Sequence, residues 1–89
     1  MRYAVIADGR DGCTYHLYAY NDDASKPTVY KWVRDDAATL TYTTFDDKDT
    51  ALYYISDKRE QLQMAENAGS IDRTTIRCTG MLLKYKTCR

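Results

Sequence analysis

Residues 39–55 read Thr-Leu-Thr-Tyr-Thr-Thr-Phe-Asp-Asp-Lys-Asp-Thr-Ala-Leu-Tyr-Tyr-Ile and contain the sharpest change of pattern in the chain. Residues 39–45 are rich in β-branched threonine, which favours a strand. Asp46 or Asp47 is the expected N-cap of a helix, and Asp49 lies in its first turn, where a carboxylate favours the positive end of the helix dipole. This stretch therefore predicts a strand that runs directly into a helix.

The predicted helix continues for roughly 18–20 residues, because apolar side chains recur at helical spacing while charged ones fall mostly elsewhere. Gly69, which follows Asn67-Ala68, is the expected residue just past the helix end. The apolar positions of this amphipathic helix are Ala51, Leu52, Ile55, Leu62 and Ala65.

Three strands are expected before this stretch. Residues 2–8 form a short apolar strand, and Gly9-Arg10-Asp11-Gly12 favours a hairpin turn, since glycine tolerates positive φ. Residues 13–20 carry apolar area on both faces, which suggests an interior strand or an aromatic outer face. A polar loop at residues 21–27 then leads to a third strand at residues 28–34.

The chain after the helix has β character from Ile71 to Thr87, and Gly80 in its middle marks a bulge or a tight turn. The predicted fold class is α+β: an antiparallel sheet of four to six strands, in the order ββββαββ, with one amphipathic helix packed on a face. We expect a single domain over residues 1–89 and an exposed sheet edge, which is a place to add a partner.

Composition and charge narrow the function classes. The apolar runs are far shorter than the roughly 20 residues of a membrane helix, so no membrane association is expected. The N-terminus lacks the pattern of a signal peptide, from which we expect a cytoplasmic location. The formal net charge is zero, with −3 in residues 1–49 and +3 in residues 50–89.

The cysteines and the histidine are the candidate zinc ligands of the chain. Cys13 and His16 have the spacing of a half-site, but in a strand they point to opposite faces, and Cys78 and Cys88 lie too far apart for the tight loop of a structural site. We expect three reduced thiols, no metal and no other cofactor. His16 is the single imidazole, and no nucleophile elbow or phosphate loop accompanies it, so we expect no enzymatic activity and no small-molecule substrate.

Acidic residues occur as doublets, which have two interpretations. Each doublet can serve a turn or a helix cap, where aspartate is favoured. If several doublets gather at one end of the sheet, they instead form an acidic surface that engages basic grooves. A metal-dependent nuclease would further need an acid from another strand and a lysine. The doublets are Asp22-Asp23, Asp35-Asp36 and Asp46-Asp47 with Asp49.

Nine tyrosines and one tryptophan exceed the needs of a small core. Tyr, Trp and Arg dominate protein interfaces, so the segments Tyr18-x-Tyr20 and Tyr30 to Arg34 are expected on an outer face, although about half of the aromatics would pack under the helix. The basic C-terminal part is either a solvated strand face or a contact to phosphate or to an acidic protein. The predicted partner-binding residues are Tyr30, Lys31, Trp32, Arg34, Asp22, Asp23, Asp35, Asp36, Arg73, Arg77, Lys84 and Lys86.

Two family resemblances bear on function. Val29-Tyr30-Lys31-Trp32-Val33 with residues 40–55 is similar to the strand–strand–helix of phage-integrase arm-binding domains, although acidic turns replace their basic ones. The whole chain resembles small phage-encoded anti-CRISPR proteins of the type I-F class. This resemblance rests on size, the Met1-Arg2-Tyr3-Ala4-Val5-Ile6 strand start, the four-strand meander and the Phe45-Asp46-Asp47 entry into one helix.

The second resemblance implies a non-catalytic inhibitor. Such a protein binds a multi-subunit RNA-guided CRISPR surveillance complex, with possible contact to guide RNA, and blocks target-DNA hybridisation or nuclease recruitment. These inhibitors share no diagnostic motif, so the resemblance transfers no residue role. The alternative hypothesis is a small DNA-binding regulator that resembles the integrase arm-binding domain.

Overall fold

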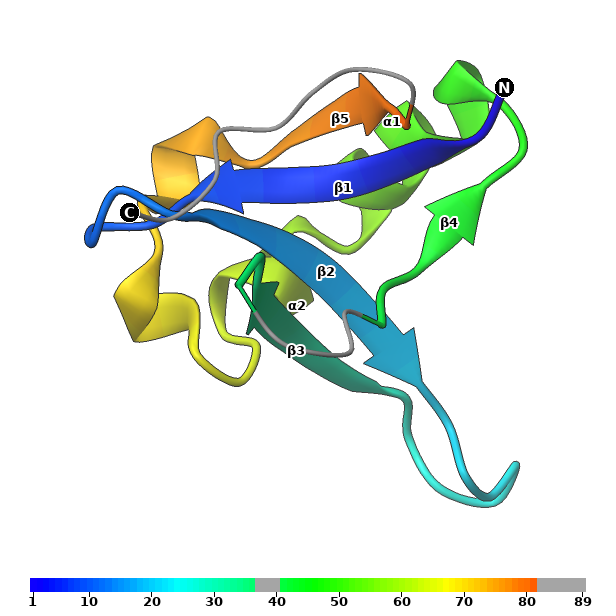
Figure 1. Ribbon diagram of the computed structural model, residues 1–89. Helices are drawn as coiled ribbons and strands as arrows, with labels where there is room; N and C mark the ends of the chain where they lie inside the picture. The colour runs from blue at the N-terminus through cyan, green and yellow to red at the C-terminus, as the bar shows by residue number, and fades with distance from the viewer. Residues whose placement is uncertain (37–40, 82–89) are drawn as a thin grey trace.

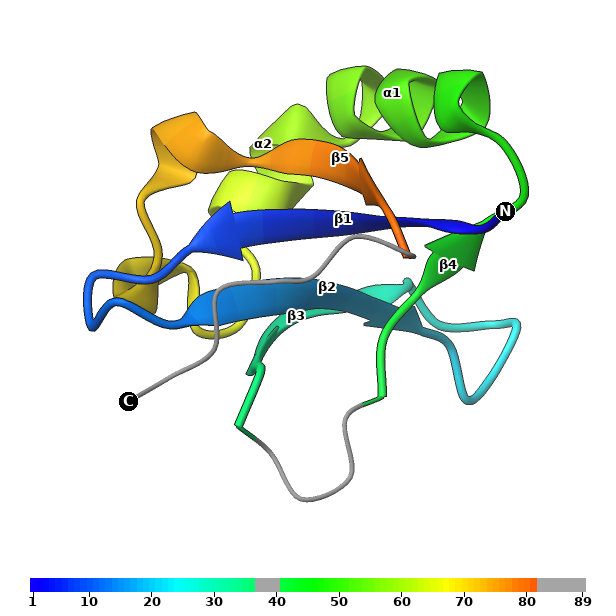
Figure 2. The ribbon, with the colours of Figure 1, turned by 45° about the horizontal axis from the view of Figure 1, so that its top comes forward.

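The structure is a computed structural model and describes residues 1–36 and 41–81. In these residues an antiparallel five-stranded sheet carries its helices on one face, which confirms the predicted α+β class (Figures 1 and 2). The strands are β1 (Tyr3–Asp8), β2 (Thr14–Tyr20), β3 (Val29–Arg34), β4 (Thr44–Phe45) and β5 (Arg77–Gly80). The helices are α1 (Lys48–Asp57), α2 (Arg59–Gln63) and the 3₁₀ turns η1 (Ala68–Ser70) and η2 (Arg73–Thr75).

Strand β1 is the centre of the sheet. Its C-terminal half pairs with β2 and its first residues pair with β4, while β5 pairs with both parts. Ile6 pairs with both β2 and β5, and Tyr3 pairs with both β4 and β5. A strand has two edges, so β5 occupies one edge of β1, and β2 and β4 lie one after the other along the opposite edge. Thr43, just before β4, fills the junction: its N–H donates to the Leu17 carbonyl at 2.9 Å, and its hydroxyl accepts from the Ala19 N–H at 2.8 Å.

The predicted hairpin turn between β1 and β2 is confirmed. The Gly9 N–H donates to the Cys13 carbonyl at 2.7 Å, and the Gly12 N–H donates to the Gly9 carbonyl at 3.1 Å. Gly12 has a φ of 85°, a left-handed conformation that L side chains adopt at a cost.

Helix α1 begins as predicted. Asp47 is its N-cap and accepts from the Thr50 N–H at 2.9 Å, and Asp49 lies in the first turn. The expectation of one continuous helix of 18–20 residues is wrong, because the backbone breaks at Lys58 between α1 and α2.

The helical region also ends earlier than predicted, at Gln63. The reason is tertiary: Glu66 pairs with β3, where its carbonyl accepts from the Trp32 N–H at 2.9 Å and its N–H donates to the Tyr30 carbonyl at 3.0 Å. Gly69 is therefore not the residue that terminates the helix but lies within η1.

The core lies between the sheet and the helices. Side chains from alternate positions of the strands meet α1 and α2, as the two-residue period of a strand requires. Trp32 is fully buried at its centre, and its indole N–H donates to the Leu62 carbonyl at 2.9 Å. The buried cluster contains Val5, Ala7, Cys13, Tyr15, Leu17, Trp32, Ile55, Leu62, Ala68 and Ile71.

Two predicted strands are shorter than expected. The fourth begins at Thr44 instead of residue 39, and residues 37–40 lie outside the described part of the chain. The last is absent over residues 71–76, because Asp72 accepts from the Thr74 N–H at 3.0 Å and caps η2 instead. Gly80 ends β5 and forms no bulge within it, and residues 82–89 lie outside the described part.

Among the described residues no helix is both long enough and apolar enough to cross a membrane.

Candidate binding surfaces

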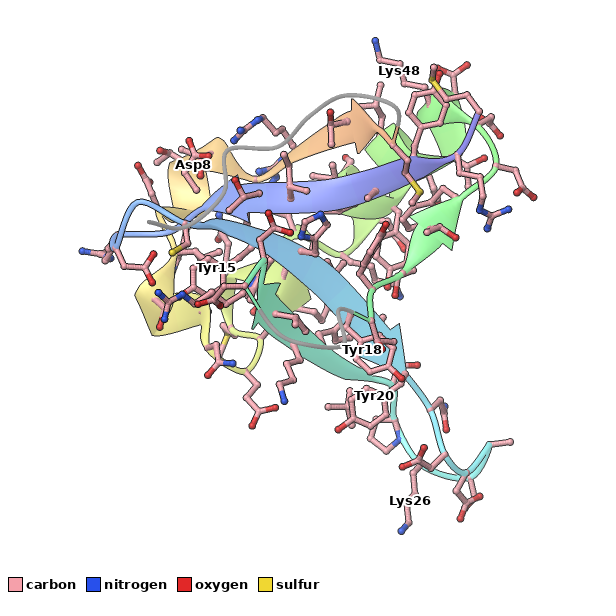
Figure 3. The ribbon with its side chains drawn as sticks, in the orientation of Figure 1. Asp8, Tyr15, Tyr18, Tyr20, Lys26 and Lys48 are labelled. Carbon is pink, nitrogen blue, oxygen red and sulfur yellow. The ribbon has the colours of Figure 1, made fainter. Side chains whose placement is uncertain are left out.

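A pair of stacked tyrosines lies on the sheet face opposite the helices (Figure 3). Tyr18 and Tyr20 alternate with core-facing positions of β2, and their ring centroids lie 5.0 Å apart with planes 24° from parallel. The pair forms one wall of a shallow hollow of about 270 Å³, which we call the tyrosine face. Its lining residues are Tyr18, Tyr20, Lys31, Val33 and Thr41. Of the aromatic and basic side chains predicted for an outer face, the structure brings Tyr18, Tyr20 and Lys31 together here.

Trp32 does not belong to that outer face, and its prediction as an exposed anchor is wrong. It has no exposed surface, because β3 turns Tyr30, Trp32 and Arg34 toward the helix side. Tyr30 is half-buried and packs against the core. Burial, and then the nearby Tyr30 hydroxyl, raises the pKa of Tyr54 well above its usual value.

Arg34 is held by carboxylates at the end of β3. Its Nε lies 3.4 Å from Asp11 and 3.3 Å from Asp36. The Cys13 N–H, which donates to Asp11 at 3.0 Å, and the Tyr15 hydroxyl, at 2.9 Å, lower the pKa of the Asp11 carboxyl. Asp11 therefore stays ionised beside Arg34. Its carboxylate stabilises the β1–β2 turn by accepting the Cys13 N–H, and Arg34 lies against that carboxylate.

Two of the three acidic doublets lie at opposite ends of the sheet. Asp22 and Asp23 lie in the β2–β3 connection, whereas Asp35 and Asp36 follow β3 at the other end of the same hairpin. The Asp23 carboxylate accepts from the Ser25 N–H and hydroxyl, both at 2.9 Å, which is the turn role. These two doublets therefore form no common acidic patch, while Asp46 pairs with Arg2 at 2.6 Å and Asp47 caps α1.

The cysteines and the histidine occupy separate places. Cys13 is disulfide-bonded, so the expectation of three reduced thiols is wrong at this position, and Cys78 has a free thiol. His16 is buried, with its ring centroid 4.6 Å from that of Tyr42 and its Nδ1 3.8 Å from Asp35. Burial lowers the pKa of His16, and the Asp35 carboxylate opposes this shift.

Metal ligands do not converge in the described ranges, where no group of three or more His, Cys, Asp or Glu side chains could hold an ion. Cys13 belongs to the helix-facing core, and His16 lies on the other face of β2, as the strand alternation predicted.

The basic residues of the C-terminal part are dispersed. Arg77 opens β5 and its guanidinium lies 3.0 Å from Asp8, while Arg73 lies in η2, so the two do not lie on one strand. Lys84 and Lys86 lie outside the described residues.

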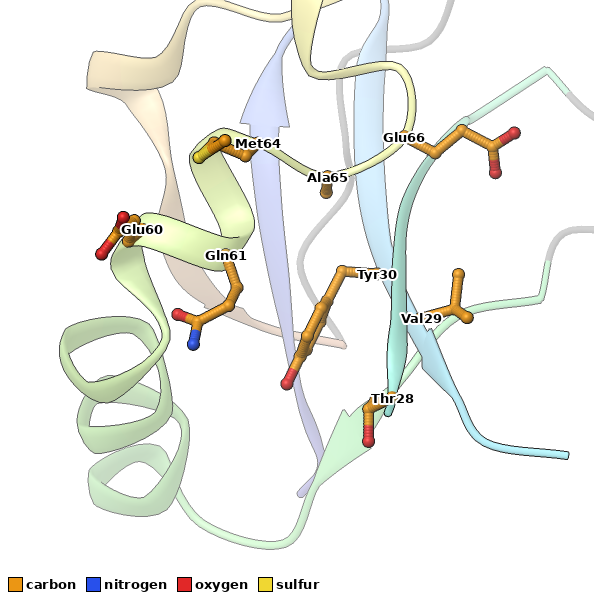
Figure 4. A pocket seen from close by; sticks show the side chains of 8 residues that line it. All are labelled: Thr28, Val29, Tyr30, Glu60, Gln61, Met64, Ala65 and Glu66. Carbon is orange, nitrogen blue, oxygen red and sulfur yellow. The ribbon is translucent and has the colours of Figure 1, made fainter. Parts of the chain in front are cut away.

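A second and larger hollow lies where α2 faces the start of β3 (Figure 4). Its volume is about 750 Å³, and we call it the β3-edge hollow. Two exposed large apolar side chains line it: Val29, at 41% exposure, and Met64, at 76%. The full lining is Thr28, Val29, Tyr30, Glu60, Gln61, Met64, Ala65 and Glu66.

The sequence analysis missed this hollow because it expected one continuous helix here, which would have placed Met64 on the solvent side, opposite Ile55. No residue pattern in the sequence indicates it, because its two sides come together only through the pairing of Glu66 with β3.

Comparisons with protein-family models, with curated proteins and with solved structures find no match.

Proposed function

We propose that this protein is a non-catalytic inhibitor that binds an RNA-guided CRISPR surveillance complex through its tyrosine face and blocks target-DNA hybridisation or nuclease recruitment. The kind of partner follows from the resemblance to type I-F anti-CRISPR proteins. The observation that supports binding is the stacked Tyr18–Tyr20 pair beside Lys31 on the helix-free side of the sheet.

The chemistry of the tyrosine face suits such a partner. Tyrosine rings offer large, rigid contact area and are enriched at protein interfaces. Exposed aromatic rings on a sheet also stack on unpaired bases, and each stacked base contributes about 1–3 kcal/mol. Lys31 adds a cation next to the rings, where a guide-RNA phosphate or a carboxylate can pair with it.

We place this activity in the host cytoplasm, where surveillance complexes act. Disulfides are uncommon in reducing compartments, so the Cys13 bond would open there. Cys13 packs on the helix side of the sheet, and the tyrosine face lies on the other side. We therefore expect partner binding to be unchanged after treatment with a reductant.

The test is an affinity pull-down from a host that carries a type I-F system, with identification of the bound proteins and RNA. The wild-type chain should capture Cas subunits together with guide RNA, and a Tyr18→Ala/Tyr20→Ala variant should capture much less. Tyr53→Ala is the matched control, because Tyr53 is 71% exposed on α1, away from the tyrosine face. Capture without Cas subunits, or equal loss in the control, would contradict the proposal.

The DNA-binding regulator is distinguished by a gel-shift titration with duplex DNA at two salt concentrations. A DNA-binding protein loses affinity steeply as salt rises, because cationic contacts release counterions from the duplex. Tight binding to free duplex with a steep salt dependence would support the regulator instead.

A further inference from the structure

We propose that the disulfide of Cys13 joins it to Cys88, and that this bond closes the chain into a ring which a thiol reductant opens. Cys13 lies directly before β2 and packs in the core. Cys88 lies outside the described residues, so the pairing is inferred from the two cysteines that the structure describes and from the sequence. The inference does not depend on the function proposed above.

The cysteines of the chain leave one partner for Cys13. The sequence contains three cysteines, Cys13, Cys78 and Cys88. Cys13 is disulfide-bonded, whereas Cys78 carries a free thiol. A bond to a second copy of the chain is disfavoured, because the Cys13 side chain is only 4% exposed and belongs to the buried cluster. The partner within the same chain is therefore Cys88.

The sheet also keeps Cys78 away from Cys13. Cys78 lies opposite Val5 on β5, whereas Cys13 lies beside Gly9, whose N–H donates to the Cys13 carbonyl. Val5 and Gly9 are about 13 Å apart along the direction of β1, at about 3.3 Å per residue. In addition, β5 and β2 lie on opposite edges of β1. The two Cα atoms of a disulfide lie within about 7 Å of each other, so Cys78 could reach Cys13 only by leaving the sheet.

The chain after β5 is long enough to reach Cys13. Strand β5 ends at Gly80, opposite Tyr3, and so at the end of β1 that lies farthest from Cys13. From Tyr3 to Gly9 the backbone advances about 20 Å, at about 3.3 Å per residue. Residues 81–88 can span up to about 29 Å, since an extended chain covers about 3.3–3.6 Å per residue. The bond is therefore compatible with the sheet as it stands, and no strand has to move.

Opening of the bond consumes two molecules of a thiol such as glutathione. The first thiolate attacks one sulfur, forms a mixed disulfide and releases the other cysteine as a thiolate, which takes up a proton. The second thiolate attacks the mixed disulfide, which frees the remaining cysteine and yields oxidised glutathione. The protein gains two electrons and two protons, and oxidised glutathione restores the bond by the reverse steps. Because the closed bond restricts the unfolded chain over a long ring, it should raise the Tm by roughly 8–30 °C.

The experiment is peptide mapping of the full chain after exposure to oxidised glutathione. Free thiols are alkylated with iodoacetamide in denaturant, and trypsin then separates the three cysteines into residues 11–31, 78–84 and 87–89. We expect residues 11–31 and 87–89 as one species, with their summed mass less two hydrogens, and residues 78–84 separate from both. Dithiothreitol should convert the linked species into its two peptides.

Two variants measure what the bond contributes. Cys88→Ser should lose the linked species and lower the Tm in oxidising buffer by roughly 8–30 °C. Dithiothreitol should lower the wild-type Tm by the same amount and leave the Tm of Cys88→Ser unchanged. Cys78→Ser is the matched control; it removes a free thiol, so it should keep both the linked species and the response to dithiothreitol. If Cys88→Ser fails to fold, the peptide map of the wild-type chain still decides the pairing.

Three results would overturn the inference. The first is a link from residues 78–84 to either of the other two peptides. The second is alkylation of all three cysteines after the oxidation. The third is a covalent dimer on a non-reducing gel in place of the linked monomer. Each of these can occur while the pull-down succeeds, so failure here is distinguishable from failure of the proposed function.

Discussion

Replacement of Trp32 by phenylalanine should destabilise the fold strongly. Trp32 is fully buried, and its indole N–H bonds the Leu62 carbonyl at 2.9 Å. Trp32→Phe leaves that buried carbonyl unpaired, at a cost of about 1–3 kcal/mol. The smaller ring also leaves a cavity of about 40 Å³, which costs about 1 kcal/mol at about 24 cal/mol per Å³.

The free energy of unfolding should therefore fall by about 2–4 kcal/mol, which lowers the Tm by roughly 8–30 °C in a domain of this size. Thermal and urea unfolding followed by far-UV circular dichroism is the appropriate assay, because the variant removes the single tryptophan of the chain. Tyr53→Phe is the control; Tyr53 is largely exposed, and its variant should stay within about 0.5 kcal/mol of the wild type.

An unchanged Tm in Trp32→Phe would refute the burial of Trp32. Fluorescence of the wild-type chain provides an independent check, since a buried indole emits at short wavelength and resists quenching by iodide. Emission typical of a water-exposed indole would return Trp32 to the outer face, where its residue type had suggested it would lie.

Three further substitutions test local features of the fold. Gly12→Ala should cost about 1 kcal/mol, because φ is 85° there, whereas Gly69→Ala, which has no atom within 4 Å of its added Cβ and no positive φ, should be close to neutral in urea unfolding. Asp47→Ala should reduce the helix content and the free energy of unfolding, as followed by circular dichroism. Hydrogen bonds from the Thr50 hydroxyl and N–H lower the Asp47 pKa, so the stability that the ionised Asp47 contributes in the wild type is present above about pH 4 and is lost as pH falls through the lowered pKa. Burial lowers the His16 pKa, so the unfolded chain binds the proton more readily; the free energy of unfolding should fall as pH drops below about 6.5, and His16→Gln should lack that part of the pH dependence.

The sequence predicted most of the local structure. Alternation placed the strands before the helix, the two glycines located the hairpin turn, and the aspartates located the start of α1. These features depend on the conformational preferences of residues that are close in the sequence, so they can be predicted from the sequence alone. The same alternation correctly grouped Tyr30 with Trp32 and Arg34 on one face of β3.

Tertiary contacts account for what the sequence did not predict. Alternation separates the two faces of a strand but does not say which face the helices cover, so Trp32 was assigned to the wrong side. The helix prediction extended too far because nothing local announces that Glu66 pairs with β3. The β3-edge hollow depends on which face of β3 the helices cover and on the pairing of Glu66 with β3. Residue pattern shows neither of these, so it did not reveal the hollow.

The central claim is that the chain inhibits an RNA-guided complex by binding it. The most direct measurement is hybridisation of labelled target DNA to a purified type I-F surveillance complex in the presence of increasing amounts of this protein. The account predicts that the wild-type chain binds the complex and reduces hybridisation or nuclease recruitment, that Tyr53→Ala does the same, and that Tyr18→Ala/Tyr20→Ala does so only at much higher concentration. Undiminished hybridisation and nuclease recruitment at saturating wild-type protein would contradict it.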